Sequence, residues 1–332
     1  MKAAVKIPVI ELANQCADCP TVSIIMLTYN HEDFIEKAIN GVINQKTDFS
    51  FELIIGEDDS TDNTRSICER KALENPEKIR LFLNNSVNKI LDENGNPTAK
   101  FNLIYSLSQC KGKYIALCEG DDFWTDQYKL QKQVDFLEKN TEFVAVFTDF
   151  DKLENNSGIV KSNFNLTRYK ISRDFEITLD NLFSKNLKLL RTLTAMYRFE
   201  IMKTFDFSYL FAAADTQCIF HALKQGKIYY MSFSSGTYRV LEESASRTKS
   251  FEKKQLFLEN YVVFLEIIRS NNKLSFQDKR YIEKTRLMSS LRRYAHDKKY
   301  FKLFYTAFQL LLFFHWTKNI FRVIKYAFKT NR

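Results

Sequence analysis

Glycine and proline are scarce in this sequence, which has 8 glycines and 4 prolines among 332 residues. No stretch is rich in Gly, Ser or Pro, and no internal repeat is found, which excludes a long flexible linker, a collagen-like chain and a repeat protein. The hydrophobic content of 45% is enough for a substantial core. We therefore expect one large domain with an appendage, or two domains.

Cysteine usage and the N-terminus also exclude several classes. The six cysteines do not form a disulfide framework, because four of them are scattered singly. Cys16 and Cys19 form one C-x-x-C pair, but the second Cys or His pair that a structural zinc site needs is missing. The first residues lack the sustained apolar core of a secretory signal. A reducing, cytoplasmic location is expected.

Positive charge is concentrated at the C-terminal end. Residues 251–332 contain 18 Lys and Arg against 6 Asp and Glu, a local net charge of +12, whereas the whole chain has +9. The first 250 residues are therefore slightly acidic. A basic tail predicts contact with an anionic surface, such as a membrane, a nucleic acid or an acidic partner.

Short apolar runs rich in β-branched residues alternate with stretches of helical spacing through the first 150 residues. This alternation predicts a parallel, doubly wound α/β sheet, in which ligands bind beyond the carboxyl ends of the strands. After residue 250 the pattern predicts successive helices. Strands are expected at 22–27, 51–55, 79–83, 114–118, 143–148, 190–197 and 228–233, and helices at 33–44, 101–110, 130–140 and 215–225, with 151–180 unassigned.

Two acidic clusters follow predicted strands. Glu57, Asp58 and Asp59 follow the second strand, and Glu119, Gly120, Asp121 and Asp122 follow the fourth. Carboxylates at strand ends often cap the next helix, and the first cluster allows that interpretation. Three acidic groups in the second cluster repel one another, and a divalent cation is the simplest compensation. No Gly-rich phosphate loop is present, so a metal would have to hold any phosphates.

Three segments together resemble the family 2 glycosyltransferases of the GT-A type: VSIIMLTYNHEDFIEKAINGVINQ, FELIIGEDDSTDNT and CKGKYIALCEGDDFWTD. The resemblance is close up to residue 126 and ends near residue 246. It implies a GT-A α/β domain over residues 21–250, with a nucleotide-sugar-binding half at 21–126 and an acceptor-binding half at 127–250. Residues 1–20 would be an N-terminal extension and 251–332 a helical, basic, membrane-associating region.

The resemblance also implies an activity, namely inverting transfer of a sugar from a nucleoside diphosphate donor, most often UDP, to a glycan or lipid-linked glycan. The transfer would depend on Mn²⁺ or Mg²⁺, with Asp121 as the metal ligand. Asp58 would bond the base, and Glu119 would lie near the ribose or a metal-bound water. The implied nucleotide-sugar-binding residues are Thr28, Tyr29, Asn30, Glu57, Asp58, Glu119 and Asp122.

The sequence departs from the family pattern at two places. The first acidic residue of each cluster is Glu where the family has Asp, so its contacts are expected to shift or to run through water. Many relatives also have a metal-binding His two residues after a Tyr-Arg pair, whereas here Tyr238 and Arg239 are followed by Val240 and Leu241. Weaker metal binding is therefore expected.

Asp215 is the predicted catalytic base. It follows three alanines, starts a predicted helix and stands where the family carries its base. An inverting transfer needs one carboxylate on the acceptor side to take the proton of the attacking hydroxyl. A plain helix N-cap is the alternative. Asp206 and Glu243 are the next candidates.

The last residues form a basic stripe on a predicted helix, since Lys318, Arg322, Lys325, Lys329 and Arg332 follow at steps of 4, 3, 4 and 3. The aromatic stretch 301–316 before it is shorter than the roughly 20 apolar residues that span a bilayer. An interfacial helix on the inner face of the cytoplasmic membrane is expected. A helix packed on the catalytic domain is the alternative, and no motif supports nucleic acid binding.

Two other functions remain open. A nucleotidyltransferase also uses a doubly wound sheet with paired carboxylates, but it would normally show a Gly-rich loop with Lys or Arg after the first strand, which TYNHED does not provide. The two Glu substitutions also allow a catalytically inactive protein that binds sugar nucleotides or acts as a scaffold.

Overall fold

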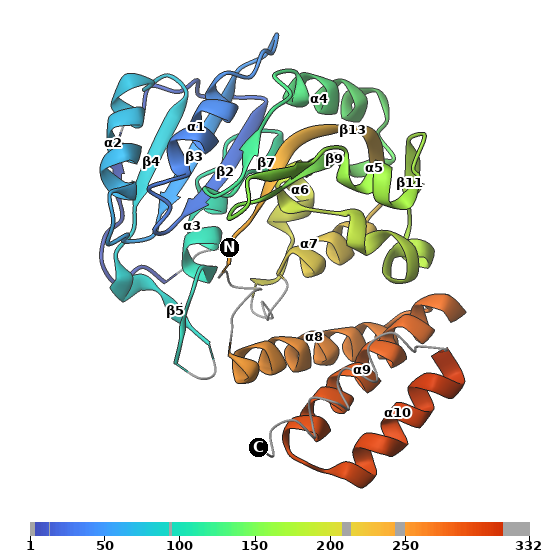
Figure 1. Ribbon diagram of the computed structural model, residues 1–332. Coiled ribbons are helices and arrows are strands. Elements are labelled where there is room, and N and C mark those ends of the chain that lie inside the picture. The colour runs from blue at the N-terminus through green and yellow to red at the C-terminus, as the bar shows by residue number, and fades with distance from the viewer. Residues whose placement is uncertain (1–3, 13, 93–94, 208–213, 243–249, 315–332) are drawn as a thin grey trace. The chain divides into compact units, whose positions relative to one another are not determined.

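The computed structural model describes residues 4–12, 14–92, 95–207, 214–242 and 250–314, and their contacts divide the chain into two compact units. The first unit comprises residues 1–178, 189–210 and 215–241, apart from those not described, and contains a mixed sheet (Figure 1). The sheet has the strand order β1-β4-β3-β2-β7-β12-β9-β13-β11. These strands are β1 (Ile10–Leu12), β2 (Val22–Thr28), β3 (Phe51–Glu57), β4 (Ile79–Leu83), β7 (Tyr114–Leu117), β9 (Phe143–Glu154), β11 (Phe175–Ile177), β12 (Met196–Arg198) and β13 (Lys227–Val240).

The strands β4, β3, β2 and β7 are parallel to one another, as the sequence predicts. β2 lies between β3 and β7, and β3 pairs in parallel with β4. The connecting helices are α1 (Ile35–Ile43), α2 (Thr64–Glu74) and α3 (Lys100–Ser108). The expected GT-A-like, mostly parallel sheet with flanking helices is confirmed, and the carboxyl ends of β2, β3, β4 and β7 meet at one edge.

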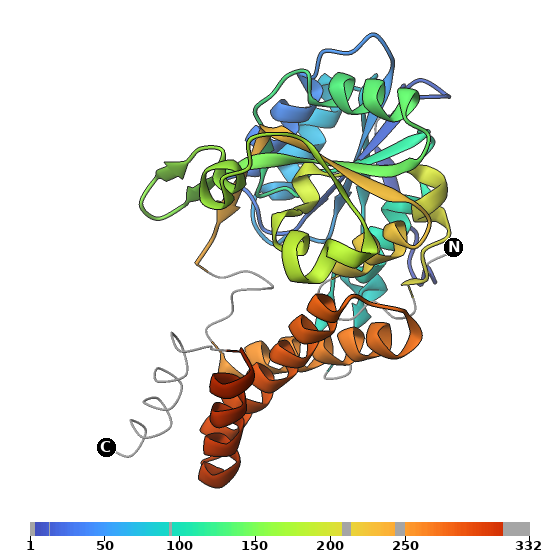
Figure 2. The ribbon, with the colours of Figure 1, turned by 90° about the vertical axis from the view of Figure 1, so that its right-hand side faces the viewer.

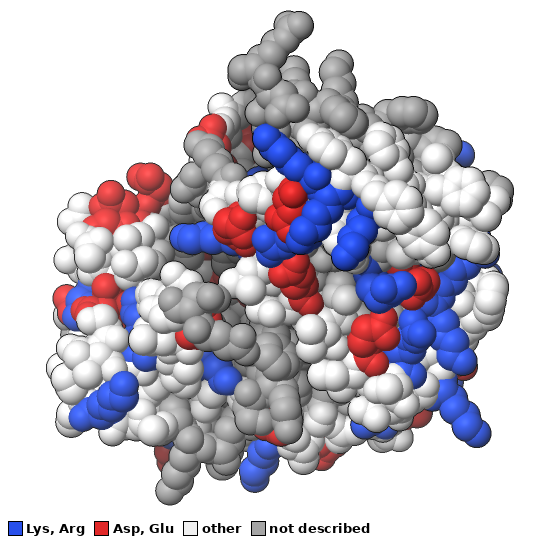
Figure 3. Space-filling view, turned by 90° about the horizontal axis from the view of Figure 1, so that it is seen from below, with Lys and Arg blue, Asp and Glu red and all other residues white. Residues whose placement is uncertain are grey.

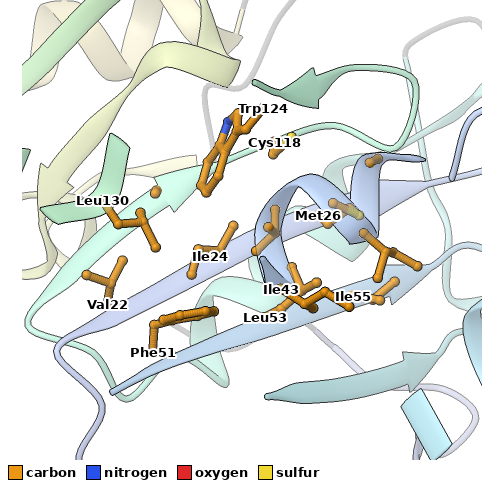
Figure 4. Close-up of a cluster of buried hydrophobic side chains, with 14 of the residues drawn as sticks. Val22, Ile24, Met26, Ile43, Phe51, Leu53, Ile55, Cys118, Trp124 and Leu130 are labelled. Carbon is orange, nitrogen blue, oxygen red and sulfur yellow. The ribbon is translucent and has the colours of Figure 1, made fainter. Parts of the chain in front are cut away.

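The main core lies between one face of the sheet and the helices α1, α2 and α4 (Lys129–Lys139) (Figure 4). Alternate residues of β2, namely Val22, Ile24 and Met26, point into this core, where Leu130 of α4 also lies. The opposite face is covered by α3, which contacts β2 and β3. Because both faces are covered, these strands are buried on both sides, and the charged Glu52 and Arg80 pair with each other within the sheet.

The second half of the sheet differs most from the predicted elements. β9 and β13 pair in parallel and run far beyond the predicted ends at residues 148 and 233, and both are long curved strands in Figures 1 and 2. The register shifts between Met231 and Ser234 and again between Ser234 and Thr237. Such bulges bend and twist a strand. After them β13 pairs with β8 (Phe123–Trp124), which leads it toward the carboxyl end of β7.

The strand predicted at 190–197 is mostly wrong. Only Met196–Arg198 forms a strand, and Thr192–Thr194 forms a 3₁₀ turn. The reason is that side chains form hydrogen bonds with the backbone there. The Trp124 indole N–H donates to the Leu193 carbonyl at 2.8 Å. The remaining short elements are β5 (Ile90–Leu91), β6 (Pro97–Thr98), β10 (Ile159–Lys161), α5 (Phe164–Tyr169), α6 (Phe199–Lys203) and α7 (Ala214–Leu223).

The segment expected as an N-terminal extension contributes to the sheet. β1 pairs antiparallel with β4 and forms its outer edge. The pairing is held by charge, because Arg80 of β4 contacts Glu11 at 2.8 Å and the buried Glu52 at 3.0 Å.

The second unit is helical and comprises residues 179–188, 211–214 and 242–332, apart from those not described. It contains α8 (Phe251–Asn271), α9 (Phe276–His296) and α10 (Tyr300–Phe314), which confirms the expected helices. Arg293 of α9 pairs with Glu259 of α8 at 3.1 Å, and Phe183 stacks on Tyr281 of α9. Among the described residues, no helix is long and apolar enough to cross a membrane. The predicted basic stripe lies outside the described residues.

Candidate active site

The carboxyl ends of β2, β3 and β7 form one continuous edge. The Asp58 N–H donates to the Thr28 carbonyl at 3.0 Å, and the Gly120 N–H donates to the Leu27 carbonyl at 3.0 Å. Gly120 is required by this close approach, because an added Cβ would lie 2.7 Å from Thr28 Oγ1 and 2.8 Å from His31 Nδ1. The two predicted acidic clusters therefore lie on either side of the β2 loop.

The loop after β2 is fixed by hydrogen bonds to the loop after β3. Asn30 has a positive φ of 54°, a conformation that Asn tolerates better than most residues. Its N–H donates to Ser60 Oγ at 3.0 Å, and its Oδ1 accepts from the Thr61 N–H at 2.9 Å. Thr28 is buried, whereas the Tyr29 ring is exposed. Among Thr28, Tyr29 and Asn30, which are predicted to bind the nucleotide sugar, Tyr29 thus presents an aromatic ring to solvent at this edge of the sheet.

Glu57 is fully engaged by its own loop. One carboxylate oxygen accepts from the Ser60 N–H at 2.7 Å, and the other pairs with Arg65 at 2.5 Å. Arg65 also reaches the Asn84 carbonyl at 3.0 Å after β4. The carboxylate therefore fastens the ends of β3, α2 and β4 together. Its predicted contact with the nucleotide stays a prediction.

Asp58 presents an unused acceptor. The residue is 6% exposed, Oδ2 lies 3.5 Å from Lys89 Nζ, and Oδ1 is buried without a hydrogen-bond partner. Burial raises the pKa of Asp58 to about 6, although Lys89 opposes the shift. The Lys89 ammonium also lies 4.1 Å from the centre of the Tyr29 ring. An aromatic face, a cation and a free carboxylate oxygen thus come together at this end of β3.

The carboxylates of the cluster after β7 repel one another. Burial raises the pKa of Glu119 to about 7, and the charges of Asp121 and Asp215 add to the shift. Glu119 Oε2 is buried and has no hydrogen-bond partner. Burial together with Asp121 and Glu119 holds the pKa of Asp122 well above its usual range. The structure therefore brings the carboxylates of Glu119, Asp121 and Asp122 close together. Among the described residues, no Lys or Arg side chain lies between all three.

Arg239 is a residue of this cluster that the sequence reasoning missed. Its N–H donates to Asp122 Oδ1 at 2.7 Å, and its side chain donates to the Asp121 carbonyl at 2.9 Å. The guanidinium lies 4.5 Å from the centre of the Phe34 ring. The Tyr-Arg pair was visible in the sequence, but only the extended β13 carries it to the end of β7. Arg239 fixes the backbone around Asp121 and leaves the carboxylate of Asp121 available.

Asp215 lies close to the cluster. Its charge contributes to raising the pKa of Glu119 and that of the buried Tyr197, after burial itself. α7 is described from Ala214, which places Asp215 inside the first turn of the helix rather than before it. Its Oδ1 accepts from the adjacent Thr216 N–H at 2.7 Å. The predicted base and the predicted metal ligand are thus at the same edge of the sheet.

A metal ion would need ligands besides protein side chains at this edge. In the part of the chain that the structure describes, no three His, Cys, Asp or Glu side chains are placed to hold a metal ion together. Leu241, at the position where the family pattern has a His, is apolar and half-buried. The free Oε2 of Glu119 and the carboxylate of Asp121 fit a cation that phosphates and water complete.

Comparison with known proteins now assigns the family. A sequence model described as glycosyl transferase family 2 matches residues 23–205, which is more than half of the chain. The chain belongs to glycosyl transferase family 2.

Similar proteins support this assignment over part of the chain. The family 2 chain is 36% identical over 129 residues to the putative glycosyltransferase EpsE of Bacillus subtilis (strain 168), which covers 39% of this chain and 42% of EpsE. It is 33% identical over 118 residues to the putative teichuronic acid biosynthesis glycosyltransferase TuaG of the same strain, which covers 36% of this chain and 42% of TuaG. An uncharacterized protein of Mycobacterium tuberculosis (strain ATCC 25618 / H37Rv) is 38% identical over 126 residues, 38% of this chain and 34% of its own length. The matches thus span about a third to two fifths of these relatives.

Solved structures share the fold. TarS of S. aureus, residues 1–349 in complex with UDP-GlcNAc, has a TM-score of 0.56 and 20% identity, over 83% of this chain and 73% of that chain. The mannosyltransferase PcManGT from Pyrobaculum calidifontis, in complex with GDP-Man and Mn²⁺, has a TM-score of 0.52 and 16% identity, over 97% and 88%. At these identities the likeness shows the GT-A fold of this family 2 glycosyltransferase, not its donor or acceptor.

Proposed function

We propose that this chain transfers a sugar from a uridine diphosphate sugar to a glycan or lipid-linked glycan acceptor, with inversion at the anomeric carbon. The observation that carries the donor assignment is the buried, unpartnered Oδ1 of Asp58 beside Lys89 and Tyr29. A buried acceptor without a donor is costly, and a bound base that supplies an N–H removes that cost.

The edge of uracil fits this arrangement. Its N3–H would donate to Asp58, a neighbouring carbonyl oxygen would accept from Lys89, and its ring would lie against Tyr29. Cytosine presents an acceptor at N3 and would place it against the carboxylate of Asp58. Lys89 was not among the residues predicted from sequence, since nothing in the sequence brings residue 89 to Asp58.

The diphosphate would lie at the end of β7. Asp121 and Glu119 would hold a Mn²⁺ or Mg²⁺ ion, which neutralises charge that develops on the leaving diphosphate. Asp122 would support them by keeping the β7 loop bonded to Arg239. Without a cation, the carboxylates of residues 119–122 would repel the diphosphate.

Asp215 would act as the base from the acceptor side. The acceptor hydroxyl attacks the anomeric carbon, its proton passes to the carboxylate of Asp215, and the bond between that carbon and the diphosphate oxygen breaks. The sugar then carries the new glycosidic bond, and UDP leaves. A carboxylate separate from the metal ligands suits this step, since a metal-bound carboxylate is a poor base.

Nucleotide binding and turnover test the proposal together. Calorimetric titration of UDP with and without Mn²⁺ is expected to show much weaker binding in EDTA. Asp215→Asn is expected to lower kcat by about 10² or more while leaving donor affinity nearly unchanged. Asp206→Asn is the matched control. Normal turnover of Asp215→Asn with a verified acceptor would contradict the assignment of the base.

The same titrations separate the two other functions. An inactive sugar-nucleotide-binding protein would bind UDP-sugar without transferring or hydrolysing it, whatever the metal. A nucleotidyltransferase would instead release pyrophosphate from a nucleoside triphosphate and a sugar phosphate.

A further inference from the structure

α10 is apolar on two opposite faces. Leu303, Ala307 and Leu310 are buried against Leu287, Leu291 and Ala295 of α9. On the other side of the helix, Phe301 is 86% exposed, Tyr305 59%, Phe308 59% and Leu312 54%. These four residues follow at steps of 4, 3 and 4, so they form one stripe, which we call the α10 outer face. A helix of a water-soluble unit ordinarily has a polar side here.

The surroundings of the α10 outer face are basic. α10 contains no Asp or Glu, and its first residues and the turn before it carry the exposed side chains of Lys298, Lys299 and Lys302. Lys299 pairs with Asp297 at 3.1 Å, and Arg280 donates to the Phe313 carbonyl at the other end of the helix. The described residues 251–314 have 13 Lys and Arg against 6 Asp and Glu, a net charge of +7. Figure 3 shows, from below, Lys and Arg side chains together with some Asp and Glu side chains, beside a broad area without charged side chains.

These charges favour an anionic lipid surface over a second copy of the chain. Self-association through this face would bring together two copies of residues 251–314, each with a net charge of +7 from 13 Lys and Arg against 6 Asp and Glu, and like charges across an interface oppose binding. Aromatic side chains with neighbouring Lys are typical of helices that lie in the headgroup region of a bilayer. Among the described residues no helix meets the length and hydropathy that a bilayer span needs, so α10 would lie along the surface.

We infer that the α10 outer face inserts into the interface of membranes that contain anionic lipids, with the neighbouring lysines on the headgroups. The inference uses only described residues, and it does not depend on the transfer reaction or on the basic stripe predicted for residues 318–332. The acyl boundary supplies an apolar environment for Phe301 and Phe308, and the lipid phosphates supply the countercharge.

Vesicle flotation with the full chain tests the inference. The protein is expected to float with vesicles of phosphatidylglycerol and phosphatidylcholine, and to stay behind with phosphatidylcholine alone. Phe301→Ser with Phe308→Ser is expected to reduce the bound fraction at fixed lipid at least tenfold. Phe276→Ser is the matched control, because Phe276 is 76% exposed but lies on α9. Donor binding is expected to be the same in all variants, which separates this inference from the proposed function.

Four results would overturn the inference. The first is a wild-type chain that does not float with anionic vesicles at low salt. The second is an equal loss of binding in Phe276→Ser and in the α10 double variant. The third is a wild-type dimer that the double variant dissociates, since that would make a second copy the occupant. The fourth is a melting temperature lowered by several degrees in the double variant alone, which would show that the chain itself covers the face.

Discussion

Neighbouring carboxylates at the end of the sheet differ in whether their oxygens are already hydrogen-bonded inside the protein. Glu57 and Asp58 are adjacent, yet both oxygens of Glu57 are bonded inside the protein while Oδ1 of Asp58 is buried without a partner. The difference follows from their partners, because the Ser60 N–H and Arg65 use both oxygens of Glu57. Lys89, in contrast, reaches only Oδ2 of Asp58. In the proposed donor site, Glu57 holds the loop in place, and Oδ1 of Asp58 can accept a hydrogen bond from the nucleotide base.

The pKa of Asp58 predicts how donor binding depends on pH. Burial raises this pKa to about 6, so Asp58 is ionised at pH 7.5 and mostly protonated at pH 5. A protonated carboxyl is the poorer acceptor for a base N–H, so affinity for a UDP-sugar is expected to fall as the pH drops through 6. The loss is at most about tenfold for each further pH unit.

Calorimetry from pH 5 to 8 measures this dependence. A UDP-sugar is the suitable ligand, because its diphosphate has no terminal phosphate group that titrates in this range. Asp58→Asn is expected to bind weakly with a flatter profile. Asp48→Asn, a change at an exposed position before the start of β3, is expected to behave as wild type. A profile of Asp58→Asn that falls as steeply as wild type would assign the titration to another group.

At the scale of elements, the site depends on how closely the β2 and β7 loops approach. Gly120 has no room for a Cβ beside Thr28 and His31, and the Gly120 N–H is bonded to Leu27. β13 arrives at the same loop through its bulges and supplies Arg239. The geometry of the carboxylates is thus set by three elements from distant parts of the chain.

Gly120→Ala is expected to destabilise this junction. The added methyl group must push away the side chains of Thr28 and His31, which costs about 1–3 kcal/mol in a well-packed place. We expect a lower melting temperature and weaker UDP binding, because the loops that carry Tyr29 and Asp121 must separate. Scanning calorimetry and nucleotide titration measure the two effects.

Gly158→Ala is the control for this substitution. Gly158 has a φ of +66° and nothing within 4 Å of an added Cβ, so the change strains the backbone without a clash near the site. It is expected to lower the melting temperature while leaving UDP affinity unchanged. UDP affinity equal to wild type in Gly120→Ala would show that the close approach does not position the donor site.

At the scale of the whole molecule, the helical unit is not made only of C-terminal residues. Residues 179–188 belong to it, and Phe183, which is 3% exposed, stacks on Tyr281 of α9. The chain thus crosses from the sheet unit to the helical unit and back before α8 begins. The division at residue 250 that the sequence predicts leaves this crossing out.

A chain that ends at residue 250 is therefore expected to be less soluble than the full chain. It would expose Phe183, whose burial contributes about 1.5–3 kcal/mol. Light scattering and binding of an apolar dye are expected to increase, and Phe183→Ser in the shortened chain is expected to reverse much of that increase. A shortened chain that stays monodisperse with the full-length melting temperature would contradict this expectation.

The parallel half of the sheet and its acidic edge could be predicted from sequence because their signals are local. Apolar runs such as residues 22–27 mark buried strands, and polar residues at their ends mark the ligand-binding edge. The contacts of the second half are not local. Leu193 lies in a 3₁₀ turn because the indole N–H of Trp124, 69 positions earlier, donates a hydrogen bond to the Leu193 carbonyl.

The sequence by itself determined the α/β class, the family, the edge where the carboxylates gather and the basic helical end. Local periodicity and short motifs carry these properties. Only the tertiary structure decided which groups at that edge are free, because hydrogen bonds and ion pairs between distant segments use up some side chains and leave others. Glu57 is held by Arg65, whereas Asp58 and Glu119 each keep a buried oxygen without a partner. Packing also decided that α10 buries one apolar face on α9 and leaves the other exposed.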